Sequence, residues 1–305
     1  MVLPDYTRTV ASTVCSFWFG ESLSPIEHLC VKSFLAHGHR FLLYTYDEVE
    51  NVPDGCELLD AATVLDEDQV FLYETSVHAG SPAGFANLFR YTLLDRDGGW
   101  WVDTDTLCLT SQIPEPEYVF ARQEEDYYNT AIMRAPAASP LIRELLTRAK
   151  RIVAEQGGSM EFGSIGPYLL TDVVRDLDFA DRAADTAALY PIPYWQALAT
   201  CDPSRRDEVE HRVAQSTFLH LWTEMFRYWR VPKTARPPTG SYLATMYDRY
   251  DIPSPGEAAY DWRTVQSVRE HRSQSGFTPL PVARNYTSIA ARQLGSDPAE
   301  RRETH

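Results

Sequence analysis

Residues 85–109 decide the fold, and they read FANLFRYTLLDRDGGWWVDTDTLCL. The first half predicts a helix over Ser81–Arg96, because its core-facing side chains recur every three or four residues and share one face. That face consists of Phe85, Leu88, Phe89, Thr92 and Leu93. Gly98 and Gly99 end the helix, and the run Trp100–Val102 predicts a short buried strand. A helix followed at once by a buried strand predicts an α/β fold.

The N-terminal part of the chain predicts the same architecture. A strand is expected at Thr13–Phe19. Ser24 followed by Pro25 is a helix-start signal, and Gly38 is a residue that commonly ends a helix. A second strand is expected at Arg40–Tyr46. A strand, a helix and a strand within about 30 residues form a βαβ unit, so the sheet begins with parallel strands.

The remaining elements are less strongly marked. Strands are expected at Leu107–Leu109, Tyr118–Ala121, Ala131–Met133 and Phe218–Trp222, and helices at Ser139–Glu155, Gly166–Leu177 and Tyr242–Tyr250. The composition changes after Arg230, where VPKTARPPTG is a proline-rich break. We therefore expect a globular domain over 1–232, a proline-rich linker with a helical extension over 233–271, and a disordered tail over 272–305.

The composition excludes several classes of protein. The chain has 305 residues, 44% of them apolar, which is typical of a globular protein. Its 28 basic and 43 acidic residues give a net charge of -15, which excludes a general nucleic-acid binder. The same charge opposes electrostatic binding to an anionic membrane, and no apolar run is long enough to span one. The lack of a signal-peptide pattern and of CxxC pairs among five cysteines predicts a cytoplasmic protein with at most peripheral membrane contact.

Two aspartates directly follow the predicted Trp100–Val102 strand. Asp103 and Asp105 would emerge at the carboxyl edge of the sheet, where α/β proteins bind ligands. Paired carboxylates suit Mg²⁺ or Mn²⁺, which often also bind substrate phosphates. Asn87 and Arg90 share one face of the preceding helix, and a guanidinium there can serve the carboxylates or a phosphate. The alternatives are a solvated turn for the aspartates and a purely structural pairing of Arg90 with one of them.

This stretch resembles the retaining glycosyltransferases whose sugar-binding region contains a DxD motif, a family that includes bacterial capsule and lipopolysaccharide transferases and α1,4-galactosyltransferases. Their pattern is a helix with a polar residue and an arginine, then Gly-Gly, an aromatic strand and Asp-x-Asp. Its residues here are Asn87, Arg90, Gly98, Gly99, Trp101, Asp103 and Asp105. Individually weaker blocks extend the resemblance over residues 10–230, at Phe17–Gly20, 24–46, Asn129, Gly166–Pro167, Leu170–Thr171 and His220–Trp222.

The resemblance implies a GT-A-type fold, with a mixed and mostly parallel sheet flanked by helices, over residues 1–232. It implies a metal-dependent transferase that uses Mn²⁺ or Mg²⁺. The donor would be a UDP- or GDP-sugar, and the acceptor a glycan, a glycolipid or another hydroxyl compound, as in polysaccharide biosynthesis. The sugar would be transferred with retention of its anomeric configuration.

The resemblance also implies roles for single residues. Donor contacts fall on Phe17, Trp18, Asn87, Arg90, Asp103 and Trp222. Trp18 would stack on the nucleobase, and Trp222 would offer its indole N–H to the diphosphate. The metal ligands are Asp105, Asp103 and His220, with Asp105 the more direct. Core positions are the alternatives for Trp18 and His220, and many family members have Asp where this chain has Asn87, so the donor sugar is not carried over.

The catalytic roles fall on Asp103, Asp105, Arg90, Asn129 and Asp172. No carboxylate has a clear claim to act as a nucleophile, so Asp172 is only a candidate, and Asn129 is a candidate orienting group. The departing phosphate is therefore the expected acceptor of the hydroxyl proton. The acidic run Glu124–Asp126 is expected to be a solvated loop or a border of the acceptor site.

The alternative hypothesis to the transferase is a haloacid-dehalogenase-like phosphatase. WVDTDT at Trp101–Thr106 fits the first motif of that class, with Asp103 as the nucleophile. The class also needs a downstream lysine and a later acidic pair. The chain has only Lys32, Lys150 and Lys233, and no adjacent Asp pair follows a clear apolar strand. The transferase is therefore favoured, and a non-catalytic sugar-binding relative is disfavoured because the whole Arg-to-DxD pattern is present.

Overall fold

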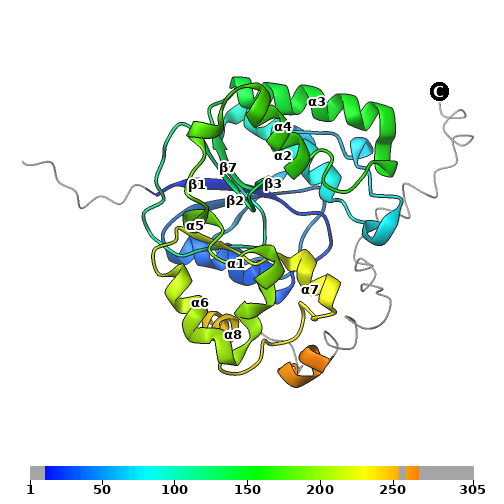
Figure 1. The fold of residues 1–305 in the computed structure, drawn as a ribbon. Coiled ribbons are helices and arrows are strands. Elements are labelled where there is room, and N and C mark those ends of the chain that lie inside the picture. Colours follow the sequence, from blue (N-terminus) through cyan, green and yellow to red (C-terminus); the bar gives the residue numbers. More distant parts are fainter. Residues whose placement is uncertain (1–10, 254–258, 268–305) are drawn as a thin grey trace, which may run out of the picture.

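The computed structural model describes residues 11–253 and 259–267, and its centre is a six-stranded sheet (Figure 1). In order across the sheet, the strands are β3 (Glu57–Asp60), β2 (Arg40–Thr45), β1 (Thr13–Phe17), β4 (Gly99–Val102), β7 (Tyr128–Ala135) and β6 (Val119–Arg122). Strand β7 runs antiparallel to both of its neighbours, so the other five strands point the same way. The expected α/β class, with a mixed and mostly parallel sheet, is confirmed.

Helices cover both faces of this sheet. Helix α1 (Pro25–Ala36) lies against one face, and α2 (Ala83–Asp97), α3 (Pro140–Gln156) and α4 (Pro167–Asp176) cover the other (Figure 1). Strand β4 contributes side chains to the cores on both faces of the sheet. Trp100 and Val102 lie in the core beside α1, whereas Trp101 lies in the core beneath α2. Successive side chains on a strand point to opposite faces, so a continuous apolar run is what a strand buried on both faces requires.

Local sequence signals set the ends of α1 and α2. Ser24 and Glu27 form a capping box at the start of α1, and Gly38 just after its end has φ +84°. After α2, Gly98 has φ +65°, and a Cβ atom there would lie 2.4 Å from the backbone nitrogen of Ala137. Only glycine permits both the conformation and this close approach. The Gly-Gly pair therefore lets the end of α2 pass beside the segment that follows β7.

A two-stranded ribbon lies outside the main sheet. It pairs β5 (Thr106–Cys108) antiparallel with β8 (Phe218–His220), with Thr106 opposite His220. The later helices are α5 (Thr186–Leu189), α6 (Arg206–Val213), α7 (Thr223–Trp229) and α8 (Tyr242–Arg249). Short 3-10 helices lie at Ala61–Thr63, Glu67–Gln69, Ser76–His78, Gly157–Ser159, Ala180–Arg182, Tyr194–Cys201 and Pro203–Arg205.

The segment after the proline-rich break packs onto α1 and the ribbon. Tyr247 of α8 shares a buried cluster with Leu29 of α1 and Leu107 of β5. Lys233 forms an ion pair with the buried carboxylate of Glu27. The domain boundaries at 232 and 271 stay predictions, and the expected tail at 272–305 lies outside the described residues.

The structure differs from the expected strands at β3, β7 and β8, and the strand expected at 13–19 ends at Phe17. Strand β3 was not predicted, because ELLD is a short edge strand that is largely exposed and shows no apolar run. Strand β7 is longer than the predicted 131–133, because polar residues continue its ladder. The strand expected at 218–222 ends at His220, because Trp222 adopts a left-handed conformation with φ +56° and begins α7.

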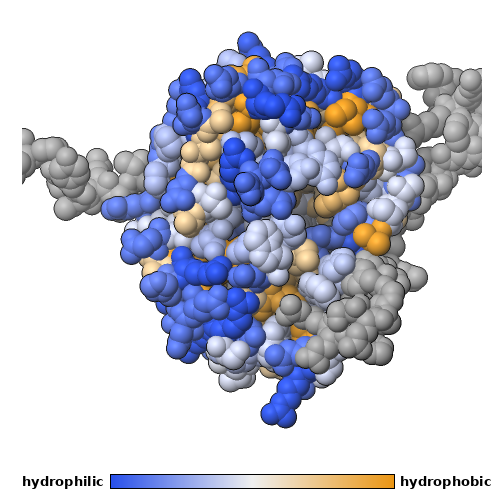
Figure 2. Space-filling model, viewed as in Figure 1, coloured by the Kyte–Doolittle hydropathy of each residue, from blue (hydrophilic) through white to orange (hydrophobic). Residues whose placement is uncertain are grey.

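The surface in Figure 2 is mostly hydrophilic, and its hydrophobic side chains appear in small separate groups. Among the described residues, no helix has the length and apolar character that crossing a bilayer requires. The five cysteines are free thiols, and Cys30, Cys108 and Cys201 are buried. Most apolar residues of the described chain are therefore buried in its internal clusters.

Candidate metal and nucleotide-sugar site

Asp103 lies directly after β4, at the carboxyl edge of the main sheet. Its backbone N–H donates to the carbonyl oxygen of Ala131 at 2.7 Å, which fixes the chain against β7. Its side-chain Oδ1 accepts hydrogen bonds from Arg90 at 2.5 Å and from the Trp101 indole at 2.7 Å. Among the described residues, both side-chain donors bind Oδ1, so Oδ2 is the oxygen that remains for a ligand.

Arg90 is the buried partner of this carboxylate. Its side chain is only 3% exposed, whereas that of Asp103 is 33% exposed. The guanidinium stacks over the Trp101 ring at 4.9 Å and donates to the Asn87 side chain, which also accepts from Thr130 at 3.1 Å. The structure therefore shows Arg90 paired with Asp103, which was the structural alternative for this residue. From its buried position, Arg90 orients the Asp103 carboxylate.

Asp105 is held from a different part of the chain. Its Oδ1 lies 3.0 Å from Nε2 of His220, and its Oδ2 accepts from both the N–H and the hydroxyl of Thr223 at 2.9 Å. Burial by itself would raise the pKa of the Asp105 carboxyl. The charge of His220 and the hydrogen bonds from His220 and Thr223 outweigh burial and hold this pKa well below its usual range. Asp105 is therefore an anion that can bind a cation.

The ribbon brings these residues together across 115 positions of sequence. A turn in which the N–H of Thr106 donates to the carbonyl of Asp103 redirects the chain from β4 into β5. Pairing of β5 with β8 then places His220 opposite Thr106, and the N–H of Leu221 donates to the carbonyl of Asp105 at 2.9 Å. The left-handed residue Trp222 turns the chain, so that the Thr223 N–H reaches the carboxylate.

The three side chains fit a divalent cation. One ligand atom from each of Asp103, Asp105 and His220 lies within 4.8 Å of the other two. Ligands at right angles on an octahedral ion with bonds of about 2.1 Å are about 3.0 Å apart. Asp105 Oδ1 and His220 Nε2 are hydrogen-bonded at 3.0 Å, so a cation that replaced the shared proton would find these two atoms already at such a spacing. Two carboxylate oxygens with one imidazole suit Mn²⁺ well.

His220 is the less completely supported ligand of the three. A metal-bound histidine usually donates its second ring N–H to an acceptor. The Nδ1 atom of His220 is buried and has no hydrogen-bond partner among the described residues. The structure therefore supports the two aspartates as metal ligands more strongly than it supports His220.

Two of the predicted donor-binding side chains are used elsewhere. Phe17 is 6% exposed and stacks on Phe89 at 4.5 Å, so its ring belongs to the core, and a donor contact of this residue stays a prediction. The indole N–H of Trp222, which was expected on the diphosphate, donates to the carbonyl of Ile192 at 2.7 Å. Its ring packs 4.1 Å from that of His220, so Trp222 supports the ligand. Both side chains are largely buried, with exposed fractions of 6% for Phe17 and 7% for Trp222.

Trp18 remains the aromatic residue of that block with an accessible side chain. It is half-buried at the end of β1, and the ammonium of Lys233 lies 5.9 Å from its ring. Its backbone N–H donates to the carbonyl of Tyr44 and so continues the β1–β2 ladder. The sheet thus positions Trp18 along the same edge as Asp103, where base stacking remains a prediction.

The two candidate catalytic residues lie in different settings. Asn129 is 7% exposed at the start of β7, where its amide donates to Gln123 at 2.6 Å and its carbonyl oxygen accepts from the Ala131 N–H at 2.7 Å. Asp172 is 51% exposed on α4 and pairs with Arg175. Asn129 is therefore a fixed residue near the β4–β7 edge, whereas Asp172 is a surface carboxylate.

The lysines do not complete a phosphatase site. Lys32 donates to the carbonyl of Asp251, Lys150 is exposed on α3, and Lys233 pairs with Glu27. None of these contacts reaches Asp103, whose Oδ1 is already bound by Arg90. The geometry gives no support to Asp103 as a phosphatase nucleophile.

Sequence reasoning missed three residues of this site. Thr223 holds Asp105, Thr130 holds Asn87, and Tyr190 lies with its ring 5.9 Å from that of His220. Thr223 had a usable signal, because a threonine directly after an apolar strand commonly begins a helix. No sequence signal pointed to Tyr190, because its contact with His220 depends on the path of the loop after α5.

No family model matches this sequence, and no curated protein does. Solved structures do match. One is the PaToxG glycosyltransferase, with 11% identity, a TM-score of 0.43, and coverage of 83% of this chain and 88% of that one. Another is the glycosyltransferase GlyE of Streptococcus pneumoniae TIGR4, with 12% identity, a TM-score of 0.39, and coverage of 90% of this chain and 66% of that one. With likenesses this distant, the function of this chain has to be inferred from its own site residues.

Proposed function

We propose that this protein is a metal-dependent glycosyltransferase that moves a sugar from a nucleotide-sugar donor to a hydroxyl acceptor. The observation that carries the proposal is the cluster of Asp103, Asp105 and His220 at the carboxyl edge of the sheet. The cluster combines an anionic Asp105 with a buried arginine behind Asp103, and it lies along the same edge as Trp18. A diphosphate bridged by a divalent cation is the ligand that such an arrangement fits.

The cation is what reconciles the acidic site with an anionic donor. A divalent ion bound there would supply the positive charge that stabilises the leaving diphosphate. Its ligands would be Asp105 and Asp103, with His220 as the third, and Mn²⁺ or Mg²⁺ as the metal. Trp18 would stack on the uracil or guanine base of the donor.

The chemistry at the sugar follows from where charge develops. The bond between C1 and the diphosphate oxygen breaks, and its electron pair stays with the diphosphate. The acceptor oxygen bonds to C1, and its proton passes to an oxygen of the departing phosphate. Retention of configuration rests on the resemblance, and proton transfer to the leaving group on the same face is consistent with it. Arg90 would hold the Asp103 carboxylate in its orientation throughout.

A donor screen tests the proposal. The protein is incubated with UDP- and GDP-sugars and Mn²⁺, and release of the nucleoside diphosphate is followed. We expect slow hydrolysis of one donor, its loss on addition of a chelator, and its recovery when Mn²⁺ is restored. Hydrolysis of simple phosphomonoesters with no turnover of any nucleotide sugar would overturn the proposal in favour of a phosphatase.

A further inference from the structure

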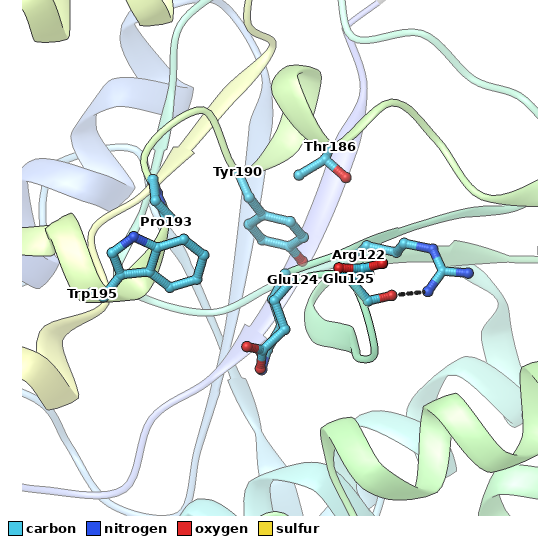
Figure 3. Close-up of a pocket in the computed structure, with 8 residues that line it drawn as sticks. Arg122, Glu124, Glu125, Thr186, Tyr190, Pro193 and Trp195 are labelled. Carbon is cyan, nitrogen blue, oxygen red and sulfur yellow. Dashed lines mark hydrogen bonds between the residues drawn. The ribbon is translucent and has the colours of Figure 1, made fainter.

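A pocket of about 390 Å³ opens between the β6–β7 hairpin and the segment that leads into the 3-10 helix Tyr194–Cys201 (Figure 3). Its walls include Gln123, Glu124, Glu125, Tyr190, Pro193 and Trp195. The volume falls in the range of about 300–1,000 Å³ that small-molecule sites occupy. In Figure 3, Tyr190 and Glu124 lie between Trp195 on one side and Arg122 on the other.

Two residues of the pocket wall, Gln123 and Tyr190, contact residues that lie next to the metal cluster. The side-chain oxygen of Gln123 accepts a hydrogen bond from the side-chain amide of Asn129 at 2.6 Å. The Tyr190 hydroxyl donates to the side-chain oxygen of Asn129 at 3.4 Å. The ring of Tyr190 also packs 5.9 Å from that of His220 and 5.5 Å from that of Trp222. A molecule in the pocket would therefore lie beside the residues that surround the proposed donor.

The sheet places this pocket on the far side of the metal cluster from Trp18. Trp18 follows β1, Asp103 follows β4, and the wall residue Gln123 follows β6. These three strands point the same way, with β4 between β1 and β6. The carboxyl edge thus presents, in order, Trp18, the metal cluster and the pocket. In the proposed transfer, the base and the diphosphate of the leaving nucleoside diphosphate would occupy the first two, and the acceptor would approach the transferred sugar from the pocket.

The side chains of the pocket fit an uncharged sugar. Trp195 is 54% exposed, the largest exposed fraction among the large apolar residues of the described chain. An indole face is electron-rich and attracts the polarised C–H bonds on one face of a pyranose ring. Two carboxylates, Glu124 and Glu125, can accept hydrogen bonds from sugar hydroxyls.

The charge of the pocket argues against an anionic occupant. Its cation, Arg122, donates to the backbone carbonyl of Glu125 and stacks over the Tyr128 ring at 4.5 Å. The carboxylates of Glu124 and Glu125 would repel a phosphate or a carboxylate at this range. A lipid headgroup phosphate or an acidic sugar is therefore a poor fit.

We propose, on the basis of the transferase function above, that this pocket is the acceptor site and that it binds a neutral sugar residue of a glycan. Trp195 is the stacking platform, and Glu124 holds a hydroxyl of the acceptor. The acceptor class is thereby a saccharide and not a protein side chain.

Two measurements with methyl glycosides of glucose, galactose and N-acetylglucosamine test this. The first is the rate of nucleoside diphosphate release from the turned-over donor with Mn²⁺, with and without each glycoside. The second is saturation-transfer NMR between protein and glycoside, which needs no donor. We expect at least one glycoside to raise the release rate and to receive saturation. Trp195→Ala should weaken that glycoside's effect about tenfold through its KM, while leaving donor hydrolysis by water unchanged.

The controls separate the two proposals. Leu58→Ala removes another exposed apolar side chain, 45% exposed on β3 and away from the pocket, and should change neither measurement. Glu124→Gln should lower glycoside binding and preserve the fold. Absence of any donor turnover would overturn the transferase, whereas donor hydrolysis without stimulation or saturation by any glycoside would overturn the acceptor site alone. Stimulation by a serine- or threonine-containing peptide but by no glycoside would also overturn it.

Discussion

Asp103 and Asp105 are two residues apart, yet different regions of the molecule hold them. Asp103 is bound by Arg90 and Trp101, which belong to the α2–β4 unit of the main sheet. Asp105 is bound by His220 and Thr223, which come from the β8–α7 turn beyond the ribbon. The first support is local in sequence, and the second joins distant parts of the chain. A DxD pair is thus a junction between two structural units.

The largest effect is expected from removing the charge of Asp105. Asp105→Asn should lower donor turnover by about 100-fold or more, because the carboxylate that would bind the cation becomes neutral. Asp103→Asn should cost less, since Oδ1 of Asp103 is already committed to Arg90 and Trp101. Release of nucleoside diphosphate and titration with Mn²⁺ measure both variants. An Asp103 variant that is as inactive as the Asp105 variant would show that the two carboxylates contribute equally.

Removing Arg90 should damage the fold of the first region. Arg90→Met leaves Asp103 without its buried partner and should lower the free energy of unfolding by about 3 kcal/mol. The matched control is Arg175→Met, which breaks the exposed pair with Asp172 and should cost less than about 1 kcal/mol. Urea unfolding compares the two. Equal losses would mean that Arg90 is not an anchor of the α2–β4 unit.

A smaller effect is expected from the hydroxyl that holds Asp105. Thr223→Val keeps the backbone N–H bond and removes only the hydroxyl bond, so donor turnover should fall about tenfold. Thr223→Ser retains the hydroxyl and serves as the control, with turnover near that of the wild type. If valine and serine behave alike, the ribbon region positions Asp105 through its backbone alone.

The smallest effect concerns acid stability of the same region. Burial alone would raise the pKa of Glu224, but hydrogen bonds from Arg227 and His78 and their charges lower it. A carboxyl with a lowered pKa in the folded state stabilises the protein above its unfolded pKa of about 4.3, and this stabilisation is lost as the pH falls through the folded value.

Glu224→Gln should therefore lower the melting temperature near pH 6.5 by more than it does near pH 3.5. Glu155→Gln, on an exposed position of α3, is the control and should show no such difference. Calorimetric scans at several pH values measure both. A gap between wild type and Glu224→Gln that stays constant with pH would contradict the assigned contacts.

The part of the site that lies within one continuous segment was predictable from the sequence. The stripe of α2, the Gly-Gly pair and the apolar β4 run put Asn87, Arg90 and Asp103 on one helix–strand unit, where they contact one another. His220 was reached through the resemblance, and the structure places it 3.0 Å from Asp105, whereas its role as a metal ligand stays a prediction. Thr223 and Tyr190 were missed. Thr223 reaches Asp105 only because β5 pairs with β8, and Tyr190 reaches His220 only through the loop that follows α5.

The sequence did not indicate how deeply two of the expected donor residues are buried. Phe17 packs on Phe89 and Trp222 on His220, and these contacts depend on tertiary packing. The sequence also gave no reason to join Trp195, Tyr190 and Gln123 into one pocket. Each lies on a connection whose path depends on long-range packing.

The sequence by itself determined the α/β class, the capped helices, the two-faced β4 strand and the acidic pair that follows it, because each depends on periodicity or on residues close in the chain. Only the tertiary structure decided which groups complete the site. The pairing of β5 with β8 and the left-handed turn at Trp222 bring His220 and Thr223 onto Asp105, and the parallel direction of β1, β4 and β6 places Trp18, Asp103 and Gln123 along one edge. These arrangements arise from contacts between distant segments, which local residue preferences do not encode.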